Sequence, residues 1–191
     1  MASKLIPTPS QTVGPFFHIG LARPEWADLT SGAPQGERIS IEGRVVDGDG
    51  AGVPDALIEL WQANAAGRYN HPDDRQEDKA IDPGFRGYGR SATDMEGKYR
   101  FVTIKPGPVP GRGNALQAPH VNIAIFARGM LKQLYTRIYF AEGAGNQNDP
   151  LLSAIDDAAA RKTLIAAREA DGVYRFDIVL QGDGETVFLD I

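Results

Sequence analysis

The sequence predicts an all-β fold: a β-sandwich core with long loops, an N-terminal arm and one short helix. Short alternating apolar runs recur from residue 39 to the end of the chain, and turns rich in Asp and Gly separate most of them. The best helix candidate is the Ala-rich segment 153–162. The chain of 191 residues suits one domain, so we expect an arm over residues 1–37 and a sandwich domain over residues 38–191.

The expected arm shows little periodic pattern and contains several prolines. Residues 8–17 should be extended, because a residue that precedes proline avoids the helical region. The apolar pair Phe16-Phe17 in this segment needs to be buried. Two alternatives stay open: an arm that packs over its own domain, or an arm that reaches into a neighbouring subunit.

The strands of the domain are expected at residues 39–46, 56–61, 98–104, 120–126, 134–140, 164–167 and 173–180. The pair Asp171-Gly172 is a strong hairpin signal between the last two. A polar excursion over residues 68–90 separates the second strand from the third. A loop of that length in a compact domain is usually functional or disordered.

Composition excludes several classes of protein. The chain has no Cys, which rules out disulfides, thiolate metal sites and Cys nucleophiles and suits a reducing, cytoplasmic location. Its net charge is -5 and its basic residues are scattered, which argues against nucleic-acid binding and docking on anionic membranes. We see no signal-peptide core and no window apolar enough to span a membrane.

The most informative stretch is residues 105–128, a loop rich in Pro and Gly followed by an alternating run that predicts a strand. The side chains of Val121, Ile123 and Ile125 should point to one face of this strand, and those of His120 and Asn122 to the other. A metal site at this position would need His-x-His, but the sequence has His-x-Asn.

Most common catalytic motifs are missing: there is no phosphate loop, dinucleotide fingerprint, G-x-S-x-G elbow or H-E-x-x-H. The remaining candidates for chemistry are Tyr69, His71, His120, Asn122 and Arg128.

Several longer runs resemble one known family, the intradiol ring-cleavage dioxygenases. They are TPSQTVGPFFHIGL at 8–21, ELWQANAAGRYNH at 59–71, DPGFRGYGRSATD at 82–94, TIKPGPVPGR at 103–112, APHVNIAIFARG at 118–129, TRIYF at 136–140 and YRFDIVLQGDGETVFLDI at 174–191. The resemblance extends over nearly the whole chain.

The resemblance implies one Fe(III) held by two Tyr and two His, since hard phenolate ligands stabilise ferric iron. The positions that match the ligand motifs are Tyr69, Val109, His120 and Asn122, which we call the relic site. Val cannot bind a metal, and neutral Asn is a poor substitute for imidazole. An Arg that precedes the His pair by three residues in iron-binding chains is Gln117 here. We therefore expect no metal in this chain.

The chain thus resembles the subunit without iron in those family members that are built from two kinds of chain. This implies a partner subunit that holds the Fe(III), and a contribution from this chain to the partner's substrate site. The matching positions are Thr12, Gly14, Pro15 and Arg128, which we call the arm corner. Gly permits close backbone approach, Pro fixes a bend, Thr offers a hydroxyl, and Arg can neutralise a substrate carboxylate.

The resemblance implies that the complete enzyme cleaves an aromatic ring between two hydroxyl-bearing carbons, using O2. Two other interpretations stay open from the residues. One is a transthyretin-like β-sandwich binding module, which the turn-rich run at 40–56 also suits. The other is an independent metalloenzyme with a divergent site.

Overall fold

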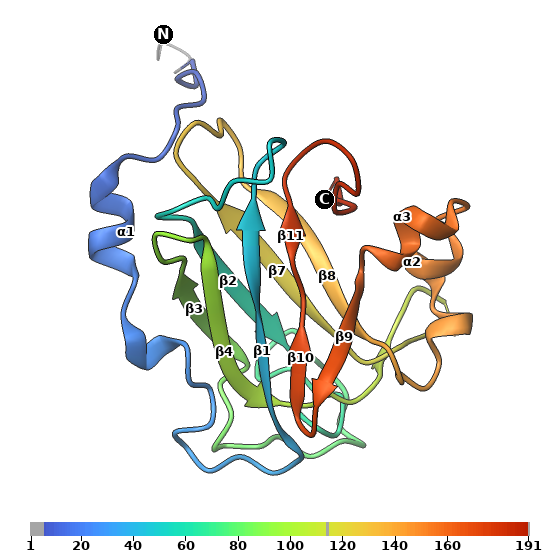
Figure 1. Cartoon of the computed structure of the whole chain (residues 1–191). Helices are drawn as coiled ribbons and strands as arrows, with labels where there is room; N and C mark the ends of the chain where they lie inside the picture. Colours follow the sequence, from blue (N-terminus) through green and yellow to red (C-terminus); the bar gives the residue numbers. More distant parts are fainter. Residues whose placement is uncertain (1–5, 114, 191) are drawn as a thin grey trace, which may run out of the picture.

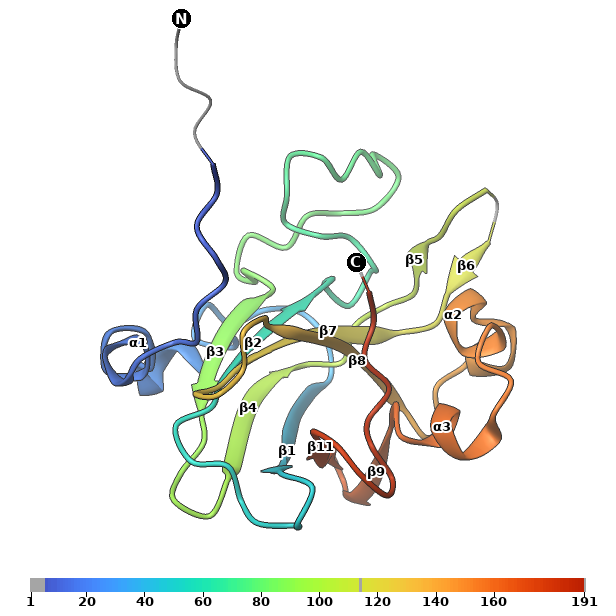
Figure 2. The ribbon, with the colours of Figure 1, turned by 90° about the horizontal axis from the view of Figure 1, so that it is seen from above.

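The computed structural model describes residues 6–113 and 115–190, apart from the side chains of Pro15 and His18. Its strands lie in two facing layers, with short helices at the edges (Figures 1 and 2). One layer contains β2, β3, β7 and β8, and the other contains β1, β4, β9, β10 and β11. Pairing between β8 and β9 links the layers into one continuous hydrogen-bonded path. The predicted β-sandwich is therefore confirmed.

The strands of the two layers are β1 (Arg38–Val46), β2 (Leu57–Gln62), β3 (Tyr88–Ala92), β4 (Lys98–Ile104), β7 (His120–Phe126), β8 (Leu134–Phe140), β9 (Ile165–Ala170), β10 (Val173–Arg175) and β11 (Ile178–Val179). A separate ribbon pairs β5 (Val109–Pro110) with β6 (Leu116–Gln117). Neighbours β2, β7 and β8 are antiparallel, whereas β1 runs parallel to β10 and β11.

The core lies between the layers and follows the alternation read from the sequence. Val121, Ile123 and Ile125 of β7 are at most 1% exposed and point into it. Each such side chain contributes about 1.5–3 kcal/mol when it is fully buried. The polar positions of the same strand lie on its other face, as predicted, which brings His120 and Asn122 together outside the core.

Two predictions about strands were wrong. The end of the expected excursion 68–90 enters β3 at Tyr88, because residues 88–92 pair with β2 along its edge. The expected strand 173–180 is split into β10 and β11, since Gly43 of β1 approaches the backbone at Phe176 and the two pieces pair with different parts of β1.

The helix prediction also needs correction. The segment 153–162 is not one helix: α2 (Pro150–Ser153) ends at its first residue, and α3 (Ala158–Lys162) covers only its second half. Asp149 and Asp157 each accept hydrogen bonds from backbone N–H groups of the turn that follows, so each aspartate starts a new helix. Two 3-10 turns, η1 (Pro24–Trp26) and η2 (Asn146–Asn148), complete the short helical elements of the described residues.

The arm is not extended throughout, since helix α1 (Pro15–Leu21) begins inside the segment expected to be extended. Pro15 occupies the first helical turn, where its fixed φ is favourable. Phe17 packs on Phe126 of β7, with ring centroids 5.4 Å apart, so the arm lies over its own domain. Phe16 is 81% exposed, so this chain alone does not bury it, and its expected burial stays a prediction for a subunit contact.

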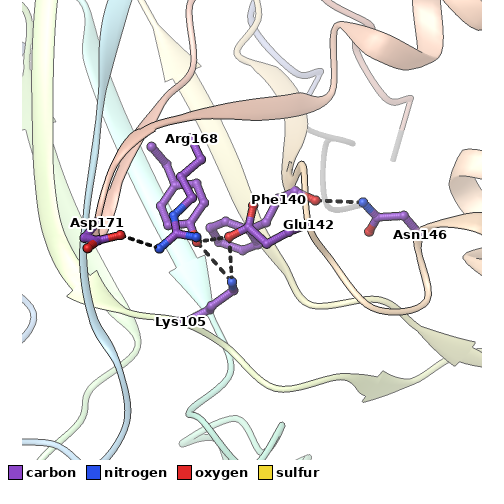
Figure 3. A network of polar contacts seen from close by, with 7 residues as sticks. Lys105, Phe140, Glu142, Asn146, Arg168 and Asp171 are labelled. Atoms are coloured by element: carbon purple, nitrogen blue, oxygen red, sulfur yellow. Dashed lines mark hydrogen bonds and ion pairs between the residues drawn. The ribbon is translucent and has the colours of Figure 1, made fainter.

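A polar network fixes the start of the long loop that follows β4 (Figure 3). Lys105 donates to Glu142 and to the Tyr174 hydroxyl, 3.0 Å in each case. The Lys105 ammonium also lies 5.5 Å from the centroid of the Phe140 ring. These contacts anchor residue 105 between the layers, so that the loop beyond it can pass over the relic site.

Candidate functional site

The structure brings the relic site together at the start of β7, in the layer that contains β2, β3, β7 and β8. Asn122 follows His120 by two residues on the same face of β7. The loop after β2 carries Tyr69, whose hydroxyl accepts a long hydrogen bond of 3.3 Å from Asn122 Nδ2. Val109 of the β5–β6 ribbon is 3% exposed and lines the same cavity as Tyr69. The four positions are thus neighbours, as their shared motif set implies.

An arginine from the next strand joins this cluster. Arg137 of β8 lies directly opposite Asn122 in the sheet register. Its Nε donates to Asn122 Oδ1 at 3.0 Å, and its Nη1 donates to Gln117 Oε1 at 2.6 Å. The same Nη1 lies 3.4 Å from the Tyr139 hydroxyl. The guanidinium therefore contacts Asn122, one of the four positions that match a ligand motif, and Gln117.

His120 is held by a buried turn. Its Nδ1 donates to the Ala118 carbonyl at 2.8 Å, which leaves Nε2 as the lone-pair nitrogen, and Nε2 is buried without a hydrogen-bond partner among the described residues. Burial, with the nearby Arg137 charge, lowers the pKa of His120 to about 4. The imidazole is consequently neutral near pH 7.

Asp149 stabilises this turn through hydrogen bonds. Its fully buried carboxylate accepts from the Ala118 N–H at 2.8 Å and from the Tyr139 hydroxyl at 3.0 Å. It also caps α2 through the N–H groups of Leu151 and Leu152. One carboxylate thus fixes both the His120 turn and the start of a helix.

Tyr69 is placed as an aromatic neighbour and a neutral phenol. Its ring stacks on Trp61, with centroids 5.5 Å apart and planes 17° apart. Burial raises the pKa of the Tyr69 hydroxyl, so the phenolate form that ferric iron prefers is disfavoured.

The residues of the relic site do not fit ferric iron. Val109 has no ligand atom, and the Asn122 oxygen is already engaged by a cation. Only the neutral Tyr69 and His120 remain, which is too few for a stable site of this kind. Within residues 6–113 and 115–190, no three His, Asp or Glu side chains are arranged to hold a metal ion.

A cavity of about 540 Å³ borders the relic site. Its wall includes Trp61, Tyr69, His71, Val109 and Pro110. His71 is half exposed and contacts the edge of the Trp61 ring. A slightly larger hollow of about 600 Å³ lies over β1, β3 and β4 and contains none of the residues predicted to form a site.

The arm corner forms at the opposite end of β7. The Gly129 N–H donates to the Thr12 hydroxyl at 2.7 Å, which places the arm beside Arg128. Arg128 Nη2 donates to Asp55 Oδ2 at 2.8 Å, and the arginine side chain is 53% exposed. Two of the four predicted residues of the corner, Thr12 and Arg128, are thus brought close by contacts within the chain.

Gly14 and Pro15 complete the corner along the backbone. A Cβ added at Gly14 would meet nothing within 4 Å in this chain, so the fold itself does not require glycine there. Pro15 begins α1, and its side chain lies outside the described part of the structure. The backbone between Thr12 and α1 is therefore open to approach from outside.

Reasoning from the sequence missed three residues of these sites: Arg137, Asp149 and Asp55. Arg137 could have been found, because pairing the two predicted strands places it across from Asn122. Asp55 carries no such signal, since its position depends on a backbone with φ +60° before β2. Asp149 precedes Pro150, which is a recognisable start of a helix, but its other contacts are long-range.

Comparison with known proteins gives a consistent assignment. The family model described as "Dioxygenase" matches residues 14–182. The chain is 42% identical to the protocatechuate 3,4-dioxygenase alpha chain of Pseudomonas putida, over 100% of both chains. It is also 42% identical to the corresponding beta chain of Burkholderia cepacia, over 93% of this chain and 77% of that one. These matches give no support to a transthyretin-like module.

A solved structure agrees with the fold. The dioxygenase domain of a dioxygenase–carbohydrate-binding protein fusion from Streptomyces sp. SirexAA-E is 26% identical, with a TM-score of 0.62 over 93% of this chain and 99% of that one. In the described residues no helix has the length and apolar character needed to cross a membrane. The matched family model, the full-length relative and the shared sandwich together show that this chain belongs to the intradiol dioxygenase family.

Proposed function

We propose that this chain is the alpha subunit of a protocatechuate 3,4-dioxygenase and that it acts with a beta subunit. The complete enzyme would cleave protocatechuate between its two hydroxyl-bearing carbons, with O2, to give 3-carboxy-cis,cis-muconate. Sequence identity alone does not separate alpha from beta, because the values are equal. The observation that carries the proposal is the chemistry of the relic site, where Val109 and Asn122 replace two ligands.

In this proposal the beta subunit holds the Fe(III), whose role is to bind and activate the ring hydroxyls for reaction with O2. This chain supplies no ligand to that metal. It contributes the arm corner, which borders the partner's pocket. For the complex we propose a cytoplasmic location, in keeping with the absence of Cys.

Arg128 is the residue that we assign to the substrate carboxylate. A carboxylate in a partly buried pocket needs a cation or several donors, since burying it unpaired is costly. The Asp55 contact holds the guanidinium at the end of β7, and more than half of its side chain is exposed. Thr12 and Gly14 would line the approach, where the open surface around Gly14 leaves space for the partner.

The test is co-expression with an intradiol-type chain that has the full Tyr/Tyr/His/His set. We expect the pair to co-purify and to cleave protocatechuate, and this chain alone to be inactive. The partner alone is the control. Cleavage by this chain purified alone, with one iron per chain, would contradict the proposal and favour an independent metalloenzyme.

A further inference from the structure

The position of Arg137 suggests a role beyond the loss of two ligands. Gln117 stands where iron-binding chains of the family carry an Arg, so a positive charge is missing from the loop. Arg137 reaches that same Gln117 from β8 at 2.6 Å. A guanidinium is never deprotonated in proteins, so the relic site always contains a full positive charge.

The guanidinium also connects the segments that the four ligand positions come from. Through Asn122 it is linked to β7 and, by the 3.3 Å contact, to the Tyr69 loop. Through Gln117 it is linked to the ribbon, because Gln117 pairs with Val109. A metal bound by the four ligand positions would join the same three segments.

The charge has a second consequence. Arg137 donates to the Oδ1 of Asn122, the atom closest in kind to a metal ligand at that position. A metal cation held there would lie beside the guanidinium in a half-buried site, where like charges repel strongly. We infer that Arg137 is the built-in cation of the relic site: it joins the three segments in place of a metal ion, and its charge keeps metal ions out.

The first experiment restores the two ligands with and without the arginine. The variants are Val109→Tyr/Asn122→His and the same pair combined with Arg137→Gln. Iron is counted in excess of the wild type prepared in the same way, and phenolate-to-iron absorption is recorded. Because only the excess is counted, the result does not depend on iron held by a partner. The inference can therefore be tested whether or not the proposed function is correct.

We expect no excess iron in the ligand-restored double variant, and iron approaching one per chain, with new visible absorption, once Arg137→Gln is added. Arg137→Lys, which keeps the charge, should leave the site without iron. Equal iron uptake with and without Arg137 would overturn the exclusion of metal by charge, and so would the absence of excess iron in both.

The second experiment tests the cross-link in the otherwise native chain. Arg137→Gln should lower the Tm by several degrees and should speed proteolysis within the Tyr69 loop, because three segments lose their shared partner. Arg112→Gln, at an exposed arginine of the neighbouring loop, is the matched control and should change neither. An unchanged Tm and unchanged cleavage in Arg137→Gln would overturn the structural role. This readout remains available if the ligand-restored variants fail to fold.

Discussion

The relic site and the arm corner lie at opposite ends of β7 and treat their polar groups in opposite ways. In the relic site, Arg137 donates hydrogen bonds to both Asn122 and Gln117, and His120 is 2% exposed. In the arm corner, Thr12 and Gly14 are exposed and Arg128 is 53% exposed. The first is closed within the chain, whereas the second presents its polar groups outward.

This contrast indicates which property of the protein a mutation at each end of β7 would change. Buried polar groups are usually hydrogen-bonded, and in the relic site Arg137 supplies a partner to Asn122 and to Gln117, whereas His120 Nε2 has none among the described residues. An exposed arginine and an open glycine carry no such requirement. The relic site should therefore respond to mutation through stability, and the arm corner through catalysis with the partner.

The largest expected effect is that of Asp149→Ala on the closed end. This change removes the acceptor for Ala118, Leu151, Leu152 and the Tyr139 hydroxyl, all of which lie near or beneath the relic site. We expect a loss of roughly 3–5 kcal/mol in the free energy of unfolding. That corresponds to a fall of about 6–20 °C in Tm for a chain of this size, measured by thermal unfolding.

Asp156→Ala is the matched control, since Asp156 is an exposed aspartate close by in the sequence. It should change stability by no more than about 0.5 kcal/mol. If the two variants melted together, the closed end would not depend on the Asp149 carboxylate.

The next effect is a pH dependence of stability that comes from His120. Its folded pKa of about 4 lies below the unfolded value of about 6.5, so between these pH values the unfolded chain binds a proton that the folded chain does not. Stability should fall as pH drops through this window, by about 3 kcal/mol in total.

The measurement is Tm against pH for the wild type and for His120→Asn, whose amide can still donate to the Ala118 carbonyl. The variant should show a flatter dependence between pH 4 and 6.5. His71→Asn removes a half-exposed histidine and is the control. A wild-type slope in His120→Asn would show that the acid sensitivity originates elsewhere.

The open end is probed by Arg128→Ala in the complex. A lost charged hydrogen bond costs about 1.5–3 kcal/mol, so KM for protocatechuate should rise about tenfold to a hundredfold where KM follows binding. Catechol lacks the carboxylate and should be much less affected. Iron content and assembly should stay the same.

Asp55→Asn is the paired control for this prediction: it removes the negative charge beside Arg128, but its amide oxygen can still accept from Arg128 Nη2, and asparagine tolerates the positive φ at this position. It should leave KM for protocatechuate unchanged or lower it. Equal losses for both substrates in Arg128→Ala would mean that the arginine supports the interface and does not read the carboxylate.

Sequence reasoning succeeded where local pattern decides the structure. The alternation in β7 predicted which of its residues enter the core and which lie on the other face. It failed where long-range pairing decides. The strand β3 is fixed by its partner β2, and the Arg137 cluster depends on the register between β7 and β8. The start of α1 was missed because the preference for extended backbone, which holds for the residue before a proline, was applied also to Pro15 and the residues after it.

The smallest effect expected is that of Thr12→Val, which tests whether the arm must be fixed to serve the open end. Valine keeps the shape of threonine but cannot accept the 2.7 Å hydrogen bond from the Gly129 N–H. This bond is exposed, so its loss should cost about 0.5–1 kcal/mol and raise KM for protocatechuate by about two- to fivefold. Because Phe17 still packs on Phe126, α1 should stay in place and the Tm of the complex should fall by no more than about 4 °C. Thr8→Val, at an exposed position earlier in the arm, is the control and should leave the kinetics as in the wild type. Steady-state kinetics of the three complexes decides the matter: if Thr12→Val behaves like Thr8→Val, the hydroxyl does not position the arm, and the arm corner depends on Arg128 and the backbone around Gly14.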